Sequence, residues 1–149
     1  MTARRRGAGK SREATLAALL LSFPEATQEN PFGPEVDVYK VAGKVFAILG
    51  GDPEAPEVSL KCDPALALEL RAEFDAVTPG YHLNKDHWNT VRLDGTVPDE
   101  VLDEMVEHSY DRVVAGHTRA VRTRLDAAAR ARPPTRKPLG RGPANEVEL

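Results

Sequence analysis

The chain has 149 residues, of which 41% are hydrophobic and 5% aromatic, and its formal net charge at pH 7 is −3. This length allows one domain with tails rather than two domains. The single cysteine, Cys62, excludes an internal disulfide bond and a cysteine-rich zinc site. No apolar run approaches the roughly 18 residues that cross a bilayer, and no cleavable signal peptide is recognisable. We therefore expect a cytoplasmic protein that makes no membrane contact.

Charged residues are sorted along the chain. Residues 1–12 carry five Lys or Arg and no acid, and residues 119–141 carry eight Lys or Arg against one acid. Residues 13–118 hold 20 acids against seven Lys or Arg. Such an acidic body repels DNA unless its cations gather on one face, because neutralised phosphates supply much of the affinity for DNA. Five of its seven cations lie in the part of the chain that we expect to form a sheet: Lys40, Lys44, Lys61, Lys85 and Arg92.

Both ends of the chain have the composition of disordered tails. Residues 133–149 contain six Pro or Gly and almost no bulky apolar residue, so they cannot bury enough surface to offset the entropy lost on ordering. The sequence predicts a disordered basic tail at residues 1–11, one folded domain at 12–131, and a disordered tail rich in Pro, Gly and Arg at 132–149.

The first expected element is a helix that starts at Ser11 and is stopped by Pro24. Its apolar stripe has helical spacing and consists of Leu16, Leu19, Leu20 and Phe23. Two strands follow at Val36–Val41 and Lys44–Leu49, joined by a tight Ala-Gly connection. We expect a loop at residues 50–53 and a third strand at Glu57–Cys62.

A second helix is expected from Asp63, because an acidic N-cap is followed by Pro at the first helical position. Its core stripe is Leu66, Leu70 and Phe74. A turn at residues 78–80 precedes the last strand, Trp88–Leu93. The final helix starts at Pro98 and is expected to continue to about Ala131. Consecutive strands predict an α+β fold with a single antiparallel sheet and helices packed on one face.

Alternation along the strands predicts which side chains face away from the helices. On the last strand Trp88, Thr90 and Arg92 point away, and on the third strand Lys61 does the same. A tryptophan on the open side of a sheet indicates a contact surface. The alternative is that Trp88 packs beneath a loop or beneath the aliphatic stem of Arg92.

Other chemistry is not expected. Cys62 follows inward-facing strand residues, so a core thiol is favoured over a reactive one. His82 and His87 lack an evident third partner, and we expect no metal site. Nothing resembles a nucleophile elbow or a phosphate-binding loop. We expect no catalytic residue, no cofactor and no enzymatic activity, and we favour a monomer.

Several stretches of the sequence resemble the MmcQ/YjbR family over roughly residues 13–115, most specifically from His82 to Val91. The matching stretches are 39–46, 58–61, 80–91 and 109–114, together with Pro98. The resemblance implies a CyaY-like α+β fold, similar to frataxin. It also implies DNA binding through two hairpin wings on the sheet, here the Lys40–Lys44 hairpin and the Gly80–Trp88 segment.

The sequence thus supports two functional hypotheses of different classes. The first is a small non-enzymatic module that binds DNA phosphates weakly and non-specifically through the wings and the basic tails. Its candidate contact residues are Lys40, Lys44, Lys61, His82, Asn84, Lys85, His87, Trp88 and Arg92. The alternative is an adaptor that docks an unidentified protein on the sheet face around Trp88. Only phosphate binding should weaken steeply with added salt.

Overall fold

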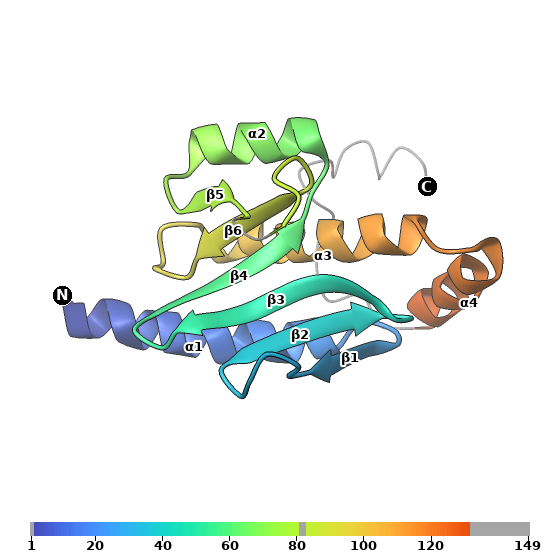
Figure 1. Ribbon diagram of the computed structural model, residues 1–149, viewed down its shortest axis with the longest axis horizontal. Coiled ribbons are helices and arrows are strands. Elements are labelled where there is room, and N and C mark those ends of the chain that lie inside the picture. Colours follow the sequence, from blue (N-terminus) through green and yellow to red (C-terminus); the bar gives the residue numbers. More distant parts are fainter. Residues whose placement is uncertain (1, 81–82, 132–149) are drawn as a thin grey trace.

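The computed structural model describes residues 2–80 and 83–131, with side chains from residue 12 onward. Within these residues the chain forms four helices and one six-stranded antiparallel sheet of order β1-β2-β3-β4-β6-β5 (Figure 1). The elements are α1 (Thr2–Leu21), β1 (Ala26–Glu29), β2 (Val36–Val41), β3 (Lys44–Asp52), β4 (Ala55–Lys61), α2 (Pro64–Glu73), β5 (Val77–Pro79), β6 (Trp88–Arg92), α3 (Asp99–Ala115) and α4 (Arg119–Arg130). This architecture confirms the α+β class with a single antiparallel sheet.

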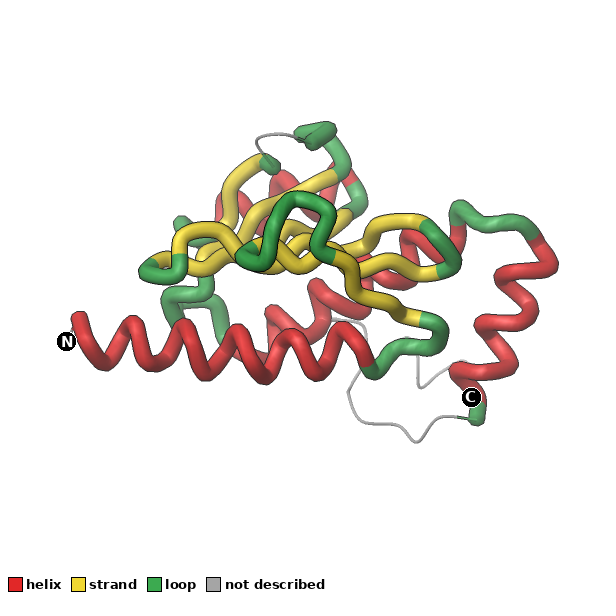
Figure 2. The backbone as a smooth tube through the Cα atoms, turned by 60° about the horizontal axis from the view of Figure 1, so that its bottom comes forward, coloured by secondary structure: helices red, strands yellow, loops and turns green. Residues whose placement is uncertain are grey.

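The helices and the sheet form two layers. Figure 2 shows the strands as one layer with α1 and α3 along the same side. Helix α2 packs on this side too, since Leu70 belongs to the core cluster and the Ala67 carbonyl accepts a hydrogen bond from the Asn89 side chain on β6. Within the described residues, the other face of the sheet is left without a helix. The prediction of helices on one face is confirmed.

The core between the layers is built from the stripes that the sequence predicts. Leu16 and Leu20 of α1 are fully buried. Phe23, which follows α1, stacks on Tyr110 of α3 with ring centroids 4.6 Å apart, and Phe46 of β3 meets Tyr110 edge-on at 5.4 Å. Such aromatic pairs add to the stabilisation that burial provides. The predicted stripe on the second helix is buried at one position: Leu70 is buried, whereas Leu66 and Phe74 are half-buried against the core.

Helix α2 begins where its capping signal predicts. The Asp63 carboxylate accepts hydrogen bonds from the backbone N–H groups of Ala65 and Leu66, at 3.1 and 3.2 Å, and Pro64 occupies the first helical position. These contacts satisfy two N–H groups that have no partner within the helix.

The predicted single helix from Pro98 to Ala131 is wrong, because the structure divides it into α3 and α4. Gly116 ends α3, and the Thr118 hydroxyl accepts from the Val121 N–H at 3.3 Å to begin α4. The new direction brings α4 to the end of the sheet at the β2–β3 turn (Figure 1). There the His117 ring hydrogen-bonds to the Val41 carbonyl at 3.0 Å, and the two side-chain oxygens of Glu25 accept from Arg124 at 2.5 and 2.8 Å.

Four further features differ from the sequence expectations. The sequence analysis had no strand at β1, and it assigned the β5 segment to a turn. Strand β3 continues through the expected loop to Asp52, since Gly50 and Gly51 adopt positive φ angles of 151° and 96° that keep them in the ladder. The backbone of α1 begins at Thr2 rather than Ser11, and so includes the basic segment expected as a tail. Arg, Ala and Lys propagate a helix readily once it has formed.

Among the residues that the structure describes, no helix combines the length and the apolarity that a bilayer crossing requires.

Candidate binding groove on the open sheet face

The open face of the sheet carries a groove of about 600 Å³. Its position follows from strand register, which aligns side chains of β2, β3, β4 and β6 in rows across this face. The middle row joins Val38, Ile48, Ser59 and Thr90. One outer row contains Val36, Gly50, Glu57 and Arg92. On the other side of the middle row lie two separate pairs, Lys40 with Val45 on β2 and β3, and Lys61 with Trp88 on β4 and β6. All of these except Lys61 and Arg92 line the groove.

Loops on both sides raise the walls of the groove. Phe32, in the β1–β2 loop, lines one side and is 75% exposed. Leu83, in the segment between β5 and β6, lines the other side with Trp88. An exposed Phe and a half-buried Trp on one apolar surface are typical of an interaction site rather than of scattered surface residues.

The polar groups on the floor satisfy each other. The hydroxyl groups of Ser59 and Thr90 are neighbours in the register and hydrogen-bond at 2.8 Å. This bond uses one of the two hydroxyl donors, and Thr90 is buried, so the middle row presents mainly the apolar side chains of Val38 and Ile48 to a ligand.

Charged side chains lie at the two ends of the groove. At one end, partial burial raises the pKa of the Glu57 carboxyl, and the positive charge of Arg92 opposes that rise. At the other end Lys40 forms an ion pair with Glu29, with Nζ and Oε1 3.1 Å apart. Glu57 itself is exposed, so this end of the groove presents a carboxylate to a ligand.

Arg71 of α2 anchors the segment that carries Trp88 and Leu83. Its guanidinium donates to the Asn89 side-chain oxygen at 2.7 Å, to the Lys85 carbonyl, and to the Trp88 carbonyl at 3.4 Å. Asn89 is 1% exposed, so this arginine links the buried side of β6 to the loop. The planar fork of an arginine suits several acceptors at once.

The structure brings together part of the predicted DNA-contact set. Lys40, Lys61, Trp88 and Arg92 belong to the open face. Lys44 lies apart from them, because its ammonium group donates to the Gly116 carbonyl at the end of α3, at 3.0 Å. Asn84, Lys85 and His87 lie in the segment before β6, and His82 lies outside the described residues.

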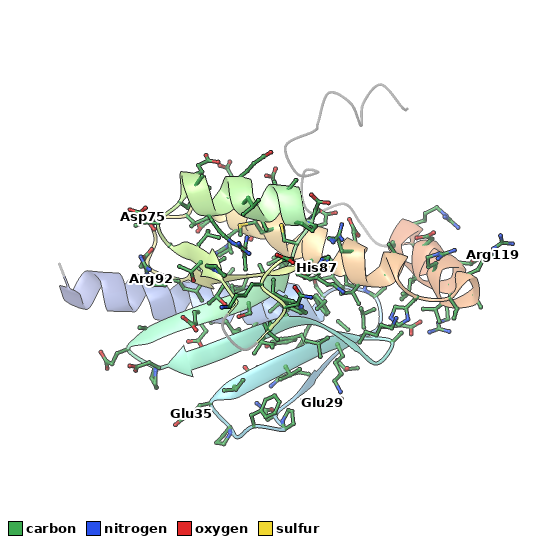
Figure 3. All side chains as sticks on the ribbon, turned by 45° about the horizontal axis from the view of Figure 1, so that its top comes forward. Glu29, Glu35, Asp75, His87, Arg92 and Arg119 are labelled. Atoms are coloured by element: carbon green, nitrogen blue, oxygen red, sulfur yellow. The ribbon has the colours of Figure 1, made fainter. Side chains whose placement is uncertain are left out.

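Several of these residues already make ion pairs or hydrogen bonds with other residues of the chain. Arg92 pairs with Asp94 at 3.4 Å, in addition to the Lys40 and Lys44 contacts described above. The Asn84 side chain accepts from the Asp86 N–H at 2.9 Å, and the His87 carbonyl accepts from the Cys62 N–H at 2.7 Å. In Figure 3, Glu29 and Glu35 lie on the β1–β2 side of the molecule, while His87 and Arg92 belong to the β6 side.

The groove residues that come from loops, Phe32 and Leu83, and the anchor Arg71 were not predicted from the sequence. The sequence contains one signal for the apolar floor of the groove. The run from Val45 to Leu49 is apolar at every position, which is typical of a strand whose two faces are both in apolar surroundings. For β4 and β6, the alternation of side chains along the strand correctly predicted which residues lie on the open face.

The other candidates for chemistry were the Cys62 thiol and a metal site. Burial raises the pKa of the Cys62 thiol to about 11, so the interpretation of a core thiol is confirmed by its burial. In the described ranges, no three His, Cys, Asp or Glu side chains lie close enough together to hold a metal ion.

Comparisons with known proteins agree with this fold. The family model described as YjbR matches residues 21–112. The Escherichia coli O157:H7 protein YbdF is 34% identical over 107 residues, covering 72% of this chain and 88% of YbdF. YjbR of Escherichia coli K12 is 44% identical over 75 residues, covering 50% of this chain and 64% of YjbR. Both relatives are described only as uncharacterized proteins.

Two solved structures are similar as well. The crystal structure of Deinococcus radiodurans protein DR2400, a DUF419 domain, superposes with a TM-score of 0.69 at 40% identity, over 76% of this chain and 86% of that one. A Pseudomonas syringae protein with 23% identity shares the fold, with a TM-score of 0.58 over 66% of this chain and 96% of its own. With the family model covering most of the folded part, and with these relatives, the chain belongs to the YjbR family.

Proposed function

We propose that this protein is a non-enzymatic binding module of the cytoplasm that holds a segment of a partner protein in the groove on its open sheet face. The observation that carries the proposal is the half-buried Trp88 beside an apolar floor that no helix of the described chain covers. Tryptophan is enriched among the residues that dominate binding energy in protein interfaces. The groove volume also lies within the range of about 300–1,000 Å³ that is usual for ligand sites.

The charge arrangement favours a protein partner over a phosphate backbone. Lys40, Lys44 and Arg92 are each engaged by an acid or a carbonyl of the chain itself, and the groove between them is apolar. A DNA-binding surface needs cations that are free to replace counterions. The sheet face instead resembles the centre of a protein interface, where apolar and aromatic side chains are surrounded by charges.

The test is a selection of peptides from a random display library on the full-length protein. We expect enriched sequences to bind the native protein, to lose binding to Trp88→Ala, and to change little in affinity between low and near-physiological salt. Val45→Asp, at another residue that lines the groove, is a second groove variant, and thermal melts establish whether both variants fold. Failure to enrich any Trp88-dependent sequence would contradict the proposal.

A second candidate, nucleic-acid binding, is supported by α4. Its exposed side chains include Arg119, Arg122 and Arg130, and Figure 3 shows Arg119 at the outer end of the molecule. A basic helix of this kind can contact phosphates without reading sequence. We expect any DNA affinity to fall steeply with salt and to be lost in the double variant Arg119→Glu, Arg130→Glu, while Lys61→Ala and Lys85→Ala report on the sheet wings. If the full-length chain binds neither duplex nor single-stranded DNA at low salt, this function is excluded.

A further inference from the structure

The two ends of the groove differ in charge. At the Val36–Glu57 end, the β3–β4 turn adds Asp52 and Glu54 next to Glu57, and the cation there, Arg92, is also paired with Asp94. At the opposite end the cations are Lys40 and Lys61, and Lys40 is balanced by Glu29. Negative charge is therefore in excess at the Glu57 end.

The Glu57 end is also accessible from the groove. Gly50 and Gly51 line it and lack side chains, and the nearest atom to a Cβ built at Gly51 would be Cγ of Glu57, at 3.4 Å. With no side chain at these positions, the apolar floor continues to the carboxylate. A ligand lying along the floor would thus reach a carboxylate that is short of positive neighbours.

From this arrangement we infer that the groove selects a polypeptide segment in which an apolar side chain is followed closely by lysine or arginine, with the cation over Glu57. This inference rests on the proposed function and adds the chemical class of the partner segment. The apolar side chain fills the floor at Val38 and Ile48 against Trp88, and the cation supplies the charge that Glu57 lacks.

The acidic groups at the Glu57 end disfavour three other occupants of the groove. A second copy of this chain would bring an equally acidic groove rim against the first, and like charges across an interface are costly. An acidic peptide meets the same repulsion at the Glu57 end. A neutral apolar peptide would fill the floor and leave Glu57 partly desolvated without a partner.

The experiment uses two blocked peptides with the same Leu-Phe-Leu centre, one flanked by lysines and the other by glutamates. Neither contains tryptophan, so the emission of Trp88, the single tryptophan of the chain, reports binding to the full-length protein. We expect the basic peptide to shift this emission at concentrations at least about ten times lower than the acidic peptide does.

Matched charge-removing variants locate the effect. Glu57→Gln should weaken the basic peptide about two- to five-fold, the range expected for a partly exposed ion pair. Glu69→Gln removes the same charge from the exposed surface of α2, on the other side of the sheet, and should change nothing. Equal effects of the two variants, or tighter binding of the acidic peptide, would overturn the inference.

These results are distinguishable from failure of the proposed function. Display sequences that depend on Trp88 but lack Lys and Arg would overturn the inference and leave the groove as a docking site. A selection without Trp88-dependent sequences would overturn both.

Discussion

The buried side chain of Ser109 joins the helix layer to the sheet. Ser109 of α3 is fully buried, and its hydroxyl donates to the Phe46 carbonyl at 2.6 Å while accepting from the Lys61 N–H at 2.8 Å. One hydroxyl thus serves backbone groups of β3 and β4, where β4 ends. Buried backbone groups without partners are costly, which makes this serine a structural element of the sheet.

We predict that Ser109→Ala lowers the free energy of unfolding by about 1–3 kcal/mol, because it leaves the Lys61 N–H and the Phe46 carbonyl without this partner. Chemical denaturation of the variant and the native protein measures the difference. A loss below about 0.5 kcal/mol would mean that water replaces the hydroxyl.

Tyr39 presents the opposite situation. Its ring is fully buried, and its hydroxyl has no hydrogen-bond partner among the described residues. Burial raises the pKa of this phenol to about 12, and the negative charges of Asp37 and Glu13 add to the effect. The folded protein therefore holds the phenol proton more tightly than the unfolded chain does.

For Tyr39→Phe we predict a gain of up to about 1 kcal/mol in the free energy of unfolding near neutral pH, since an unpaired buried hydroxyl is removed. In the native protein, stability should fall as pH rises from about 10, the ordinary pKa of tyrosine, towards about 12, because only the unfolded chain loses this proton there. The variant should lack that part of the alkaline loss. Urea melts across this pH range test both statements, and a destabilised Phe variant would contradict them.

Strand β3 requires a glycine, Gly50, where its backbone passes close to β2. A Cβ at Gly50 would lie 2.3 Å from the Glu35 carbonyl oxygen, and its φ of 151° is unfavourable for other residues. This close approach lets β3 continue to Asp52 and extends the groove floor.

Gly50→Ala should therefore destabilise the fold by more than about 2 kcal/mol, through both backbone strain and the steric clash. Gly33→Ala is the matched control, because its φ of 115° is also positive but nothing lies within 4 Å of the added Cβ. The difference between the two melting temperatures isolates the clash. Equal losses would show that β3 can move away from Glu35 at no cost.

The stretch from Leu83 to Trp88 depends on α2 through Arg71. We predict that Arg71→Lys, which keeps the charge but not the fork of donors, increases acrylamide quenching of Trp88 fluorescence and weakens peptide binding in the groove. Lys85→Ala is the control, because the hydrogen bond from Arg71 uses the Lys85 backbone carbonyl, which the substitution retains. Identical quenching in the two variants would refute the anchoring role.

The sequence predicts those elements whose signals are local. Asp63-Pro64 and the strand alternation from Trp88 identified α2 and the open face because capping and side-chain alternation act within a few residues. The break at Gly116–Thr118 was missed because apolar spacing continues through Val121 and Leu125, although Gly116 and the Thr118 cap are local signals of a helix end and a helix start. The direction of α4 after the break depends on tertiary contacts such as that of His117 with β2.

The candidate site was predictable only in part for the same reason. Trp88 was identified from its own strand, whereas Phe32 and Leu83 reach the groove from loops whose paths depend on distant contacts. Lys44 was grouped with the sheet cations, and its actual partner, the Gly116 carbonyl, is 72 residues away in sequence. Charge counting cannot anticipate such pairings.

In the folded molecule, basic residues from near the two ends of the sequence contact acidic residues of the part between them. Arg12 of α1 lies 2.6 Å from a carboxylate oxygen of Asp103 and 3.3 Å from one of Asp99, and its side chain is 14% exposed. Arg124 of α4 makes the corresponding contact with Glu25. Asp99 and Asp103 are 77% and 33% exposed, but the Arg12 side chain itself is largely buried, so its contacts tie the N-terminal helix to the start of α3.

Arg12→Gln should therefore lower the free energy of unfolding by about 1–3 kcal/mol. Arg119→Gln, on the exposed surface of α4, should change it by less than about 0.5 kcal/mol. Denaturant melts of both variants at one ionic strength provide the comparison, and equal effects would show that the contact of α1 with α3 contributes no stability.

The shortness of the two outermost strands has a consequence for solubility. A sheet with an apolar open face is prone to stack or to grow by pairing strands edge to edge. Here β1 spans four residues and ends in Glu29, and β5 spans three and ends in Pro79, which has no N–H to donate. Both edges are therefore poor templates for added strands. An exposed aromatic groove on the face of the sheet is thus combined with edges that disfavour the growth of fibrils.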